Sequence, residues 1–410
     1  MSESTSVPQD AAAETPDEQA TNLMVRRLSL VVFLEWLGAG AIIPLFPLYL
    51  KQHGASPSLI GLTMSAFFLA GLLTQFPAGR LADRIGRRPV LIGGLILYAA
   101  SCLAFILPLS AWGFIALRFV QGGAAGAVEV ASLALVSSNV PIEKRGRAIS
   151  RIFSAQLAGT AVGPLLGAVA GVQHMALLFI ATAIACTGAA IPVLTSSTIK
   201  AHDVAHIHHQ PLVRLVMSRA LLGAVFGALA LGLGIGVYEA CWTLLLHDRG
   251  GSSLAIALSW TAFSVPYVFF VRAAGWFADH WDRRMLAALG LLVSVSFCVA
   301  YPFVTSIPVL LTMGFLESVG FSFALPSLQA MMTEGRTPRE LGRVQGVYAT
   351  SQTGAIALAS AVAGVLFGMH AFLPFVVSGG IGLLLTAALL IAWAPLDGHA
   401  HHATSAEPAT

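Results

Sequence analysis

The sequence predicts an all-α membrane protein in which twelve transmembrane helices form two parallel six-helix repeats. Of the 410 residues, 57% are hydrophobic and only 10% are charged, whereas a soluble domain carries about 25% charged residues. So much apolar surface does not fit inside one core, and we expect it to face lipid. An offset of 196 residues separates Gly79 from Gly275 and also Gly146 from Gly342. Two separate landmarks that share one offset indicate an internal duplication.

Apolar runs recur along the chain, and each has roughly the ~20 residues that a spanning helix needs. They are rich in Gly and Ala, which allow helices to approach closely in lipid. The runs of the first repeat cover residues 28–50, 59–78, 90–109, 112–136, 148–170 and 175–194. Those of the second repeat cover residues 220–246, 254–277, 285–304, 308–332, 346–369 and 372–393.

Polar segments divide the chain into five parts. We expect six-helix bundles over residues 26–196 and 219–395, a linker over 197–218, a disordered tail over 1–25 and a second tail over 396–410. These boundaries follow from where the apolar runs stop.

Histidines cluster in the linker and in the second tail, and such clusters can bind transition metals. No cysteine or set of carboxylates completes a site beside them, so we predict no metal and no other cofactor. The four cysteines lie within apolar runs and are expected to be small buried residues. The clustered histidines are His202, His206, His208, His209, His399, His401 and His402.

Almost all lysines and arginines fall on one predicted side of the membrane. Only Lys51 and Arg249 face the other side, and Arg118 lies within a predicted helix. By the positive-inside rule, both termini and the linker are expected in the cytoplasm, with the chain in the plasma membrane.

A cationic loop over residues 79–89 connects the second and third predicted helices. Its glycines permit a sharp turn, and its aspartate can meet arginines and helix ends. We expect a polar latch that forms in one conformation and breaks in the other, more complete here than in the second repeat, where Asp282 replaces Gly86. The predicted gating residues are Gly79, Asp83, Arg84, Gly86, Arg87, Arg88, Asp279, Arg283 and Arg284.

The fifth predicted helix carries a face of small residues. Gly159, Gly163 and Gly167 recur every four residues and so share one side of a helix, and Pro164 removes a backbone hydrogen bond and bends it. This pattern favours a hinge or a close contact between the two halves, and simple packing is the alternative.

Several of these motifs together resemble the major facilitator superfamily. The loop after Gly79 is similar to the signature of that superfamily, and Arg118, Gln121 and Gly122 resemble its Arg-x-x-Gln-Gly motif. The fifth-helix glycines with Pro164 resemble a motif of its twelve-helix drug:proton antiporters. The resemblance implies the major facilitator fold, alternating access, and a role for Arg118 in proton coupling.

Four glutamates lie within predicted spans, where a charge costs at least about 2.5–3.5 kcal/mol. An acid retained there faces a cavity, pairs, or exchanges a proton. We expect Glu239 and Glu317 to share a cavity in the second half. The predicted proton-coupling and substrate residues are Glu35, Arg118, Glu129, Glu239 and Glu317.

Aromatic side chains accompany these acids, and carboxylates with aromatic faces suit a lipophilic cation. The predicted substrate-lining residues are Trp36, Gln121, Tyr238 and Trp242, and further aromatic side chains expected around Glu317 are Phe315, Phe321 and Phe323.

These features predict a monomeric, proton-coupled exporter of small amphipathic or cationic compounds, whose partners are its substrate, protons and the lipid bilayer. The chain has no phosphate-binding loop and no motif of an intramembrane enzyme, so we expect neither ATP-driven transport nor catalysis, and nothing suggests a nucleic-acid partner. Two alternatives stay open: a proton-coupled exporter of a metabolite such as a sugar, amino acid or siderophore, and a transport-inactive sensor or scaffold on the same fold.

Overall fold

The computed structural model describes residues 16–194 and 218–396, which form two helical halves. The first half contains α1 (Pro16–Ile42), α2 (Phe46–Gln52), α3 (Pro57–Ile85), α4 (Arg87–Ala104), α5 (Ala111–Asn139), α6 (Ile142–Ala170), the short 3₁₀ segment η1 (Val172–His174) and α7 (Met175–Leu194). The second half contains α9 (Arg219–Val237), the π-helix η2 (Tyr238–Trp242), α10 (Thr243–Asp248), α11 (Ser253–His280), α12 (Arg283–Ala300), the 3₁₀ segment η3 (Tyr301–Phe303), α13 (Ile307–Thr333), α14 (Pro338–Met369) and α15 (Leu373–Trp393).

The helices confirm the predicted fold class. Among the described residues, eleven spans are long and apolar enough to cross a membrane, and the bent pair of α1 and α2 makes a twelfth. The linker and second tail, with their seven histidines, lie outside the described residues, apart from Ser218 and Leu396.

The first helix begins earlier than the sequence predicts. Residues 16–25 were expected in a disordered tail, but they form the start of α1. Two contacts explain the difference: Met24 and Val25 are buried in the core, and Glu18 forms an ion pair with Lys144 of α6. Tertiary packing therefore extends the helix beyond its apolar run.

Two spans are interrupted at the same depth. The first span bends by 45° between α1 and α2, in a turn that contains Pro44 and precedes Pro47. The span of α9 and α10 contains the π-helix η2, in which each backbone hydrogen bond skips one more residue than in an α-helix.

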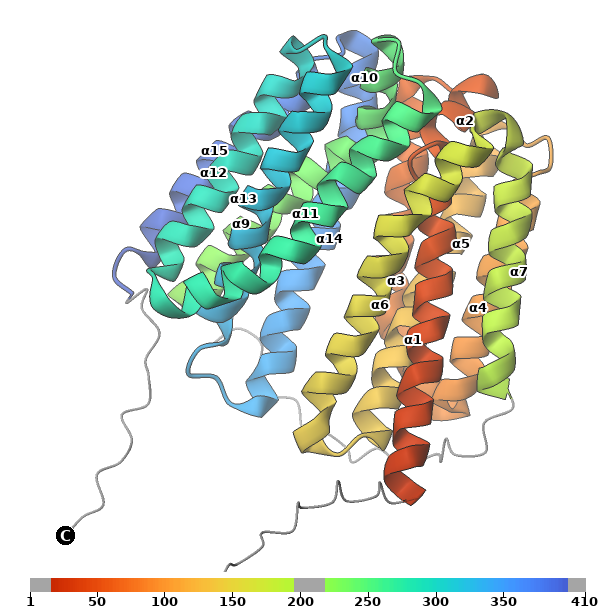
Figure 1. Cartoon of the computed structure of the whole chain (residues 1–410), viewed down its shortest axis with the longest axis vertical. Coiled ribbons are helices and arrows are strands. Elements are labelled where there is room, and N and C mark those ends of the chain that lie inside the picture. Colours follow the sequence, from red (N-terminus) through yellow and green to blue (C-terminus); the bar gives the residue numbers. More distant parts are fainter. Residues whose placement is uncertain (1–15, 195–217, 397–410) are drawn as a thin grey trace, which may run out of the picture.

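The two halves meet along α3 with α14 and α6 with α11. We call the end of the molecule that carries Lys51 and Asp248 the far end, and the end where α1 begins the near end. At the far end the backbones of α3 and α14 touch, because a Cβ atom on Gly61 would lie 2.5 Å from the carbonyl oxygen of Ser360. Toward the near end the helices of the two halves diverge (Figure 1).

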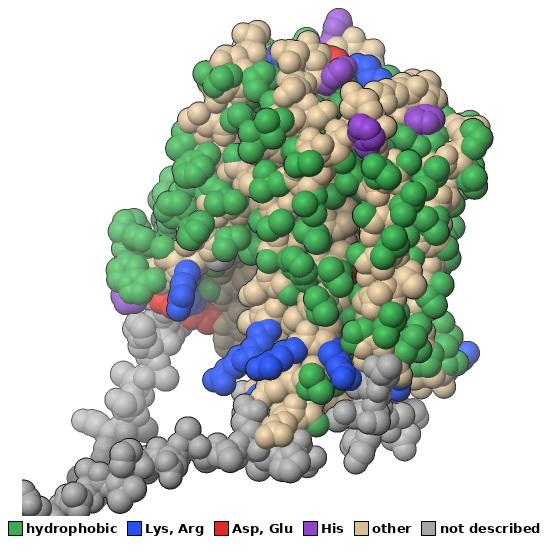
Figure 2. All heavy atoms as spheres, turned by 45° about the vertical axis from the view of Figure 1, so that its right-hand side comes forward, with side chains coloured by type: hydrophobic (Ala, Val, Ile, Leu, Met, Phe, Trp, Pro, Cys, Tyr) green, Lys and Arg blue, Asp and Glu red, His purple; other side chains and the backbone are tan. Residues whose placement is uncertain are grey.

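Charge is distributed unevenly between the two ends. In the space-filling view, most of the visible lysine and arginine side chains gather toward the near end, hydrophobic side chains cover the middle, and most of the visible histidines lie toward the far end (Figure 2). This arrangement matches a protein with an apolar belt in lipid and charged ends in water.

The predicted cationic loop is much shorter than expected. α3 continues to Ile85 and α4 starts at Arg87, so Gly86 is the single non-helical residue between them, with a φ of 97°. Only glycine adopts this conformation without strain, which explains why the turn can be so tight. In the second half Asp282 instead begins α12 as its N-cap, accepting a hydrogen bond from the backbone N–H of Arg284 at 2.8 Å.

The glycine face of α6 packs within the first half and not between the halves. Cβ atoms on Gly159 and Gly163 would lie 2.8 and 2.6 Å from backbone atoms of α1, so the two helices are in backbone contact. The contact of α6 with the other half is made from a different position: the Thr261 hydroxyl donates to the Ala161 carbonyl at 3.4 Å. The prediction of a contact between halves through these glycines is therefore wrong, because α1 occupies that face.

We expect Gly163→Ala to lower the free energy of unfolding by about 1–3 kcal/mol, because its methyl group has no space against α1. The measurement is the thermal unfolding midpoint of the purified protein in detergent. Gly188→Ala in α7 is the matched control, since a Cβ atom there would meet nothing within 4 Å. Equal midpoints for the two variants would contradict close packing of α1 and α6.

Candidate functional site

A cavity of about 630 Å³ lies between the two halves. This volume is in the range of small-molecule sites. The first half contributes Trp36 from α1 and Gln156 and Thr160 from α6, and the second half provides most of the wall, including Glu239 and Glu317. The structure thus brings together the two acids that the sequence predicted to share a cavity.

Glu317 of α13 is held by three hydroxyl groups. One carboxylate oxygen accepts hydrogen bonds from Tyr238 and Ser294, both at 2.8 Å, and the other accepts from Tyr301 at 2.6 Å. The residue is 2% exposed. Three donors of this kind satisfy a buried carboxylate in its charged form.

Glu239 of η2 is bound very differently. It is 9% exposed and lines the cavity, but its Oε2 atom is buried and has no hydrogen-bond partner among the described residues. An unpaired oxygen of a buried acid is strongly unfavourable unless a proton or a cationic group satisfies it. A π-helix often marks a functional position, because it displaces one turn from the regular helix.

Aromatic rings cover much of the cavity wall. Trp242 stacks edge-on with Tyr301 at 4.7 Å between centroids and donates its indole N–H to Ser259 at 2.8 Å. Among the described residues that line the cavity there is no lysine or arginine. The aromatic lining residues are Trp36, Phe153, Tyr238, Trp242, Trp260, Phe263, Tyr267, Tyr301 and Phe321.

Not every predicted lining residue reaches the cavity. Phe321 lines it, but Phe323 packs against Phe277 at 5.6 Å between centroids and Phe315 is exposed on the surface of α13. Gln121 is also absent from the wall, since it is buried in the first half.

Arg118 is buried inside the first half, where aromatic rings and one amide hold its charge. Its guanidinium donates to the Gln121 side-chain oxygen at 2.6 Å and lies 4.3 Å from the ring centroid of Phe67 and 5.1 Å from that of Phe46. Its Nε atom has no hydrogen-bond partner, and no carboxylate of the described residues lies within salt-bridge distance.

The two acids of the first half differ in exposure. Glu35 of α1 is buried, near Tyr98 and Cys186. Glu129, in the second half of α5, is exposed. Neither acid is among the residues that line the cavity.

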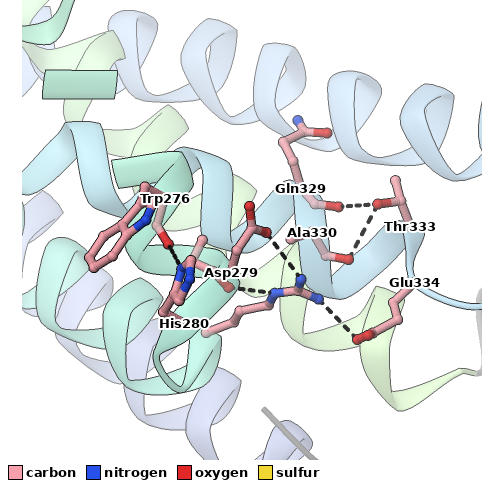
Figure 3. Close-up of polar contacts among 9 residues, drawn as sticks. Trp276, Asp279, His280, Gln329, Ala330, Thr333 and Glu334 are labelled. Atoms are coloured by element: carbon pink, nitrogen blue, oxygen red, sulfur yellow. Dashed lines mark hydrogen bonds and ion pairs between the residues drawn. The ribbon is translucent and has the colours of Figure 1, made fainter. Parts of the chain in front are cut away.

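The near end of the second half carries an ion-pair cluster centred on Arg283 (Figure 3). Arg283 lies 3.5 Å from Asp279 and 3.2 Å from Glu334, and it donates to the Ala278 carbonyl at 2.8 Å. Beside it, Arg284 pairs with Asp282 at 2.6 Å, and this partnership keeps the pKa of the Asp282 carboxyl below its usual range. These contacts tie the ends of α11, α12 and α13 together.

At the matching position of the first half, Asp83 is exposed and forms no ion pair with any described residue. The sequence indicated a more complete latch in the first half, and that latch stays a prediction, whereas the cluster around Arg283 belongs to the second half. The reason is Glu334, whose counterpart 196 residues earlier is Ser138, which cannot hold an arginine by charge.

Sequence reasoning missed several residues of the site. Tyr301 and Ser294 donate hydrogen bonds to Glu317. Both are polar residues of a largely apolar segment and lie at the depth of that acid, and their shared depth was the signal that could have identified them. Gln156 and Trp260 gave no signal, because only the convergence of α6 and α11 brings them to one cavity. All four cysteines are buried and free, as predicted.

Comparison with known proteins identifies the family. The model of the Major Facilitator Superfamily matches residues 28–238 and 224–410. The quinolone resistance protein NorA of Staphylococcus aureus is 23% identical over 365 residues, covering 88% of this chain and 94% of that protein. Multidrug resistance protein 2 of Bacillus subtilis is 25% identical over 374 residues, covering 88% and 93%.

Solved structures show the same fold. The nucleoside transporter NupG superposes with a TM-score of 0.76 at 12% identity, over 90% of this chain and 100% of that one. At this identity the likeness concerns the fold alone. Together with the family match over nearly the whole chain, it shows that the protein belongs to the Major Facilitator Superfamily and is a multi-pass membrane transporter that resembles the drug antiporters of that family.

Proposed function

We propose that this protein is a proton-coupled exporter of small aromatic or amphipathic cations. The observation that carries the proposal is the cavity, which combines two buried carboxylates with aromatic walls and has no lining lysine or arginine among the described residues. A site of this composition attracts a cation through charge and through the faces of its rings. Such a site would accept the apolar parts of a substrate and would bind anions poorly.

Glu239 is the proposed exchange site. Its unpaired oxygen calls for one positive partner, which is either a proton or the cationic group of a substrate. One oxygen does not accept both partners at once. Binding of the substrate therefore releases the proton, and binding of a proton releases the substrate. This competition gives antiport without any further device.

Glu317 is the proposed second acid, with a more restrained role. Its three hydroxyl donors already stabilise it, so a proton or cation gains less there than at Glu239. Tyr238 donates to Glu317 and precedes Glu239 in the chain, so a change at one acid is felt at the other through η2. The pair allows more than one proton for each transport cycle.

The first half supplies the opposing charge. Arg118, oriented by Gln121, is a buried cation of the first half. We propose that its charge disfavours a second positive charge on Glu239 and so helps the carboxylate to lose its proton or its cation once the cavity opens. We propose Glu35 and Glu129 as a separate proton-handling pair outside the cavity.

The relatives narrow the substrate class. NorA is named for quinolone resistance and the protein of Bacillus subtilis for multidrug resistance. Compounds of that kind are aromatic and amphipathic, which suits the rings around the cavity. We therefore propose toxic aromatic compounds with a cationic group as substrates, and not sugars or other highly polar metabolites.

We place the protein as a monomer in the cytoplasmic membrane, with both termini in the cytoplasm. The near end, where basic side chains gather, is then the cytoplasmic end. The cavity in this conformation receives substrate from inside, and proton entry supplies about 2.3 kcal/mol per charge per 100 mV of membrane potential.

We expect Glu239→Gln to weaken binding of a lipophilic aromatic cation by roughly 30-fold or more, because loss of one partner of a buried charge pair costs ~2–5 kcal/mol. Substrate-induced proton release from the purified protein should disappear as well. Binding is followed by tryptophan fluorescence and release by a pH indicator in weakly buffered detergent solution.

Glu340→Gln at the start of α14 is the control for Glu239→Gln, because it removes an acid outside the cavity. Proton release that persists in Glu239→Gln would exclude Glu239 as the exchange site. No release from the unaltered protein with any compound of a broad panel would favour the sensor or scaffold reading.

Asp83→Asn should leave the thermal unfolding midpoint unchanged, since Asp83 is exposed and forms no ion pair with a described residue. It should abolish transport into proteoliposomes, because the proposed latch forms in the other conformation. Full transport by a correctly folded Asp83→Asn protein would eliminate the latch.

Arg283→Lys should lower the free energy of unfolding by about 1–3 kcal/mol, because lysine does not reproduce the directed hydrogen bond and ion pairs of the arginine. The measurement is the thermal unfolding midpoint of the purified protein in detergent.

A further inference from the structure

The two interrupted spans are equivalent positions of the duplicated chain. α1 ends at Ile42 and α2 begins at Phe46. The offset of 196 residues maps these two residues onto Tyr238 and Trp242, which are the first and last residues of η2. Each half therefore interrupts its first span over the same five positions, once by a bend beside prolines and once by a π-helix.

A hydrogen bond joins the two interruptions. The Thr243 hydroxyl, directly after η2, donates to the Pro44 carbonyl at 2.7 Å, and the contact is buried. Pro44 lies in the turn between α1 and α2, where the helical hydrogen-bond pattern is broken. An interruption leaves backbone carbonyls in need of donors, and the other half provides this one.

Each side of this bond is close to a buried charge. On one side, Glu239 lies four residues before Thr243 in the same continuous segment. On the other side, Phe46 lies two residues after Pro44, and its ring carries the Arg118 guanidinium at 5.1 Å. Both Glu239 and Arg118 have a buried side-chain atom without a hydrogen-bond partner among the described residues.

After the residues joined by this bond, each half continues into a short helix at the far end. α2 follows Pro44 and α10 begins with Thr243, and the two helices contact each other. Lys51 of α2 pairs with Asp248 of α10 at 3.0 Å. The hydrogen bond thus lies between the turn that carries Glu239 and the two short helices of the far end.

We infer that Thr243 is a positioning residue that couples the occupancy of Glu239 to closure of the far end. The inference rests on the proposed function, because it takes Glu239 as the exchange site. While the π-helix keeps its present register, Thr243 holds Pro44 and keeps α10 against α2. A change of partner at Glu239 that shifts the π-helix breaks this bond and releases α10 from α2.

The test compares Thr243→Val, which keeps the shape but loses the hydroxyl, with Thr243→Ser, which keeps the hydroxyl. Spin labels at Gln52 and Ser252, which lie at the far end on opposite halves, report closure by pulsed electron paramagnetic resonance. We expect Thr243→Val to raise the open-to-closed ratio by roughly tenfold, as for one lost buried hydrogen bond. Export should fall by a similar factor while affinity for a lipophilic cation stays within twofold.

Thr386→Val is the matched control, because this buried threonine donates only to its own helix, at the Gly382 carbonyl. Wild-type behaviour of Thr243→Ser and Thr386→Val would support the inference. An unchanged open-to-closed ratio in Thr243→Val, or the same change in Thr386→Val, would overturn it. Failure of the proposed function gives a different result, since Glu239→Gln would then leave proton release intact whatever Thr243→Val does at the far end.

Discussion

The unsatisfied oxygen of Glu239 is the constraint on which the rest of the site depends. A charged group in the membrane interior is tolerated only with partners, and Glu317 shows that this fold can supply them from three hydroxyls. Glu239, which directly follows Tyr238 in the chain, is left without one on Oε2. The aromatic walls and the buried charge of Arg118 fit the proposed role of Glu239, in which the acid exchanges its partner and keeps no permanent one.

The duplication shows how this difference arose within one plan. The offset of 196 residues equates an aromatic cluster in the first half with one in the second, and it equates Gln121 with Glu317. Gln121 donates to Cys102 at 3.3 Å and orients Arg118, whereas Glu317 at the same place accepts from Tyr238, Ser294 and Tyr301. The two halves share the aromatic residues, but the equivalent polar residues differ. Gln121 orients the Arg118 cation, whereas Glu317 is itself the charged group. The equated aromatic residues are Phe46, Phe105 and Phe179 with Trp242, Tyr301 and Phe375.

The fold could be predicted from the sequence because its main signals are local. Apolar runs of spanning length and a repeated offset need no knowledge of how helices pack, and they predicted the spans and the shared cavity of Glu239 and Glu317. What failed depended on tertiary contacts: the start of α1, which core packing extends to Pro16, and the partner of the α6 glycines, which is α1. Hydrophobicity shows which faces are buried, but not which neighbour buries them.

The ion-pair cluster of the second half also depends on a residue that lies outside the recognised motif. The motif around Gly79 is the better match to the family pattern, but an ion pair needs an acid at the right place on a third helix. Glu334 provides it in the second half, and no motif includes that residue. How closely one loop matches the family motif therefore does not predict which loop carries the ion-pair cluster.

Different contacts hold the two ends of the molecule. The Lys51–Asp248 pair is nearly half exposed on both sides, with 46% and 45% of each side chain accessible, and such pairs contribute about 0–1 kcal/mol. The far end is thus closed mainly by dry contacts: the backbones at Gly61 and the buried bond from Thr243 to Pro44. The ion pairs described at the near end join residues within one half, as between Glu18 and Lys144 or around Arg283, and do not bridge the two halves. We therefore expect the far end to open only after a stronger event, and the proposed change of partner at Glu239 is the candidate for it.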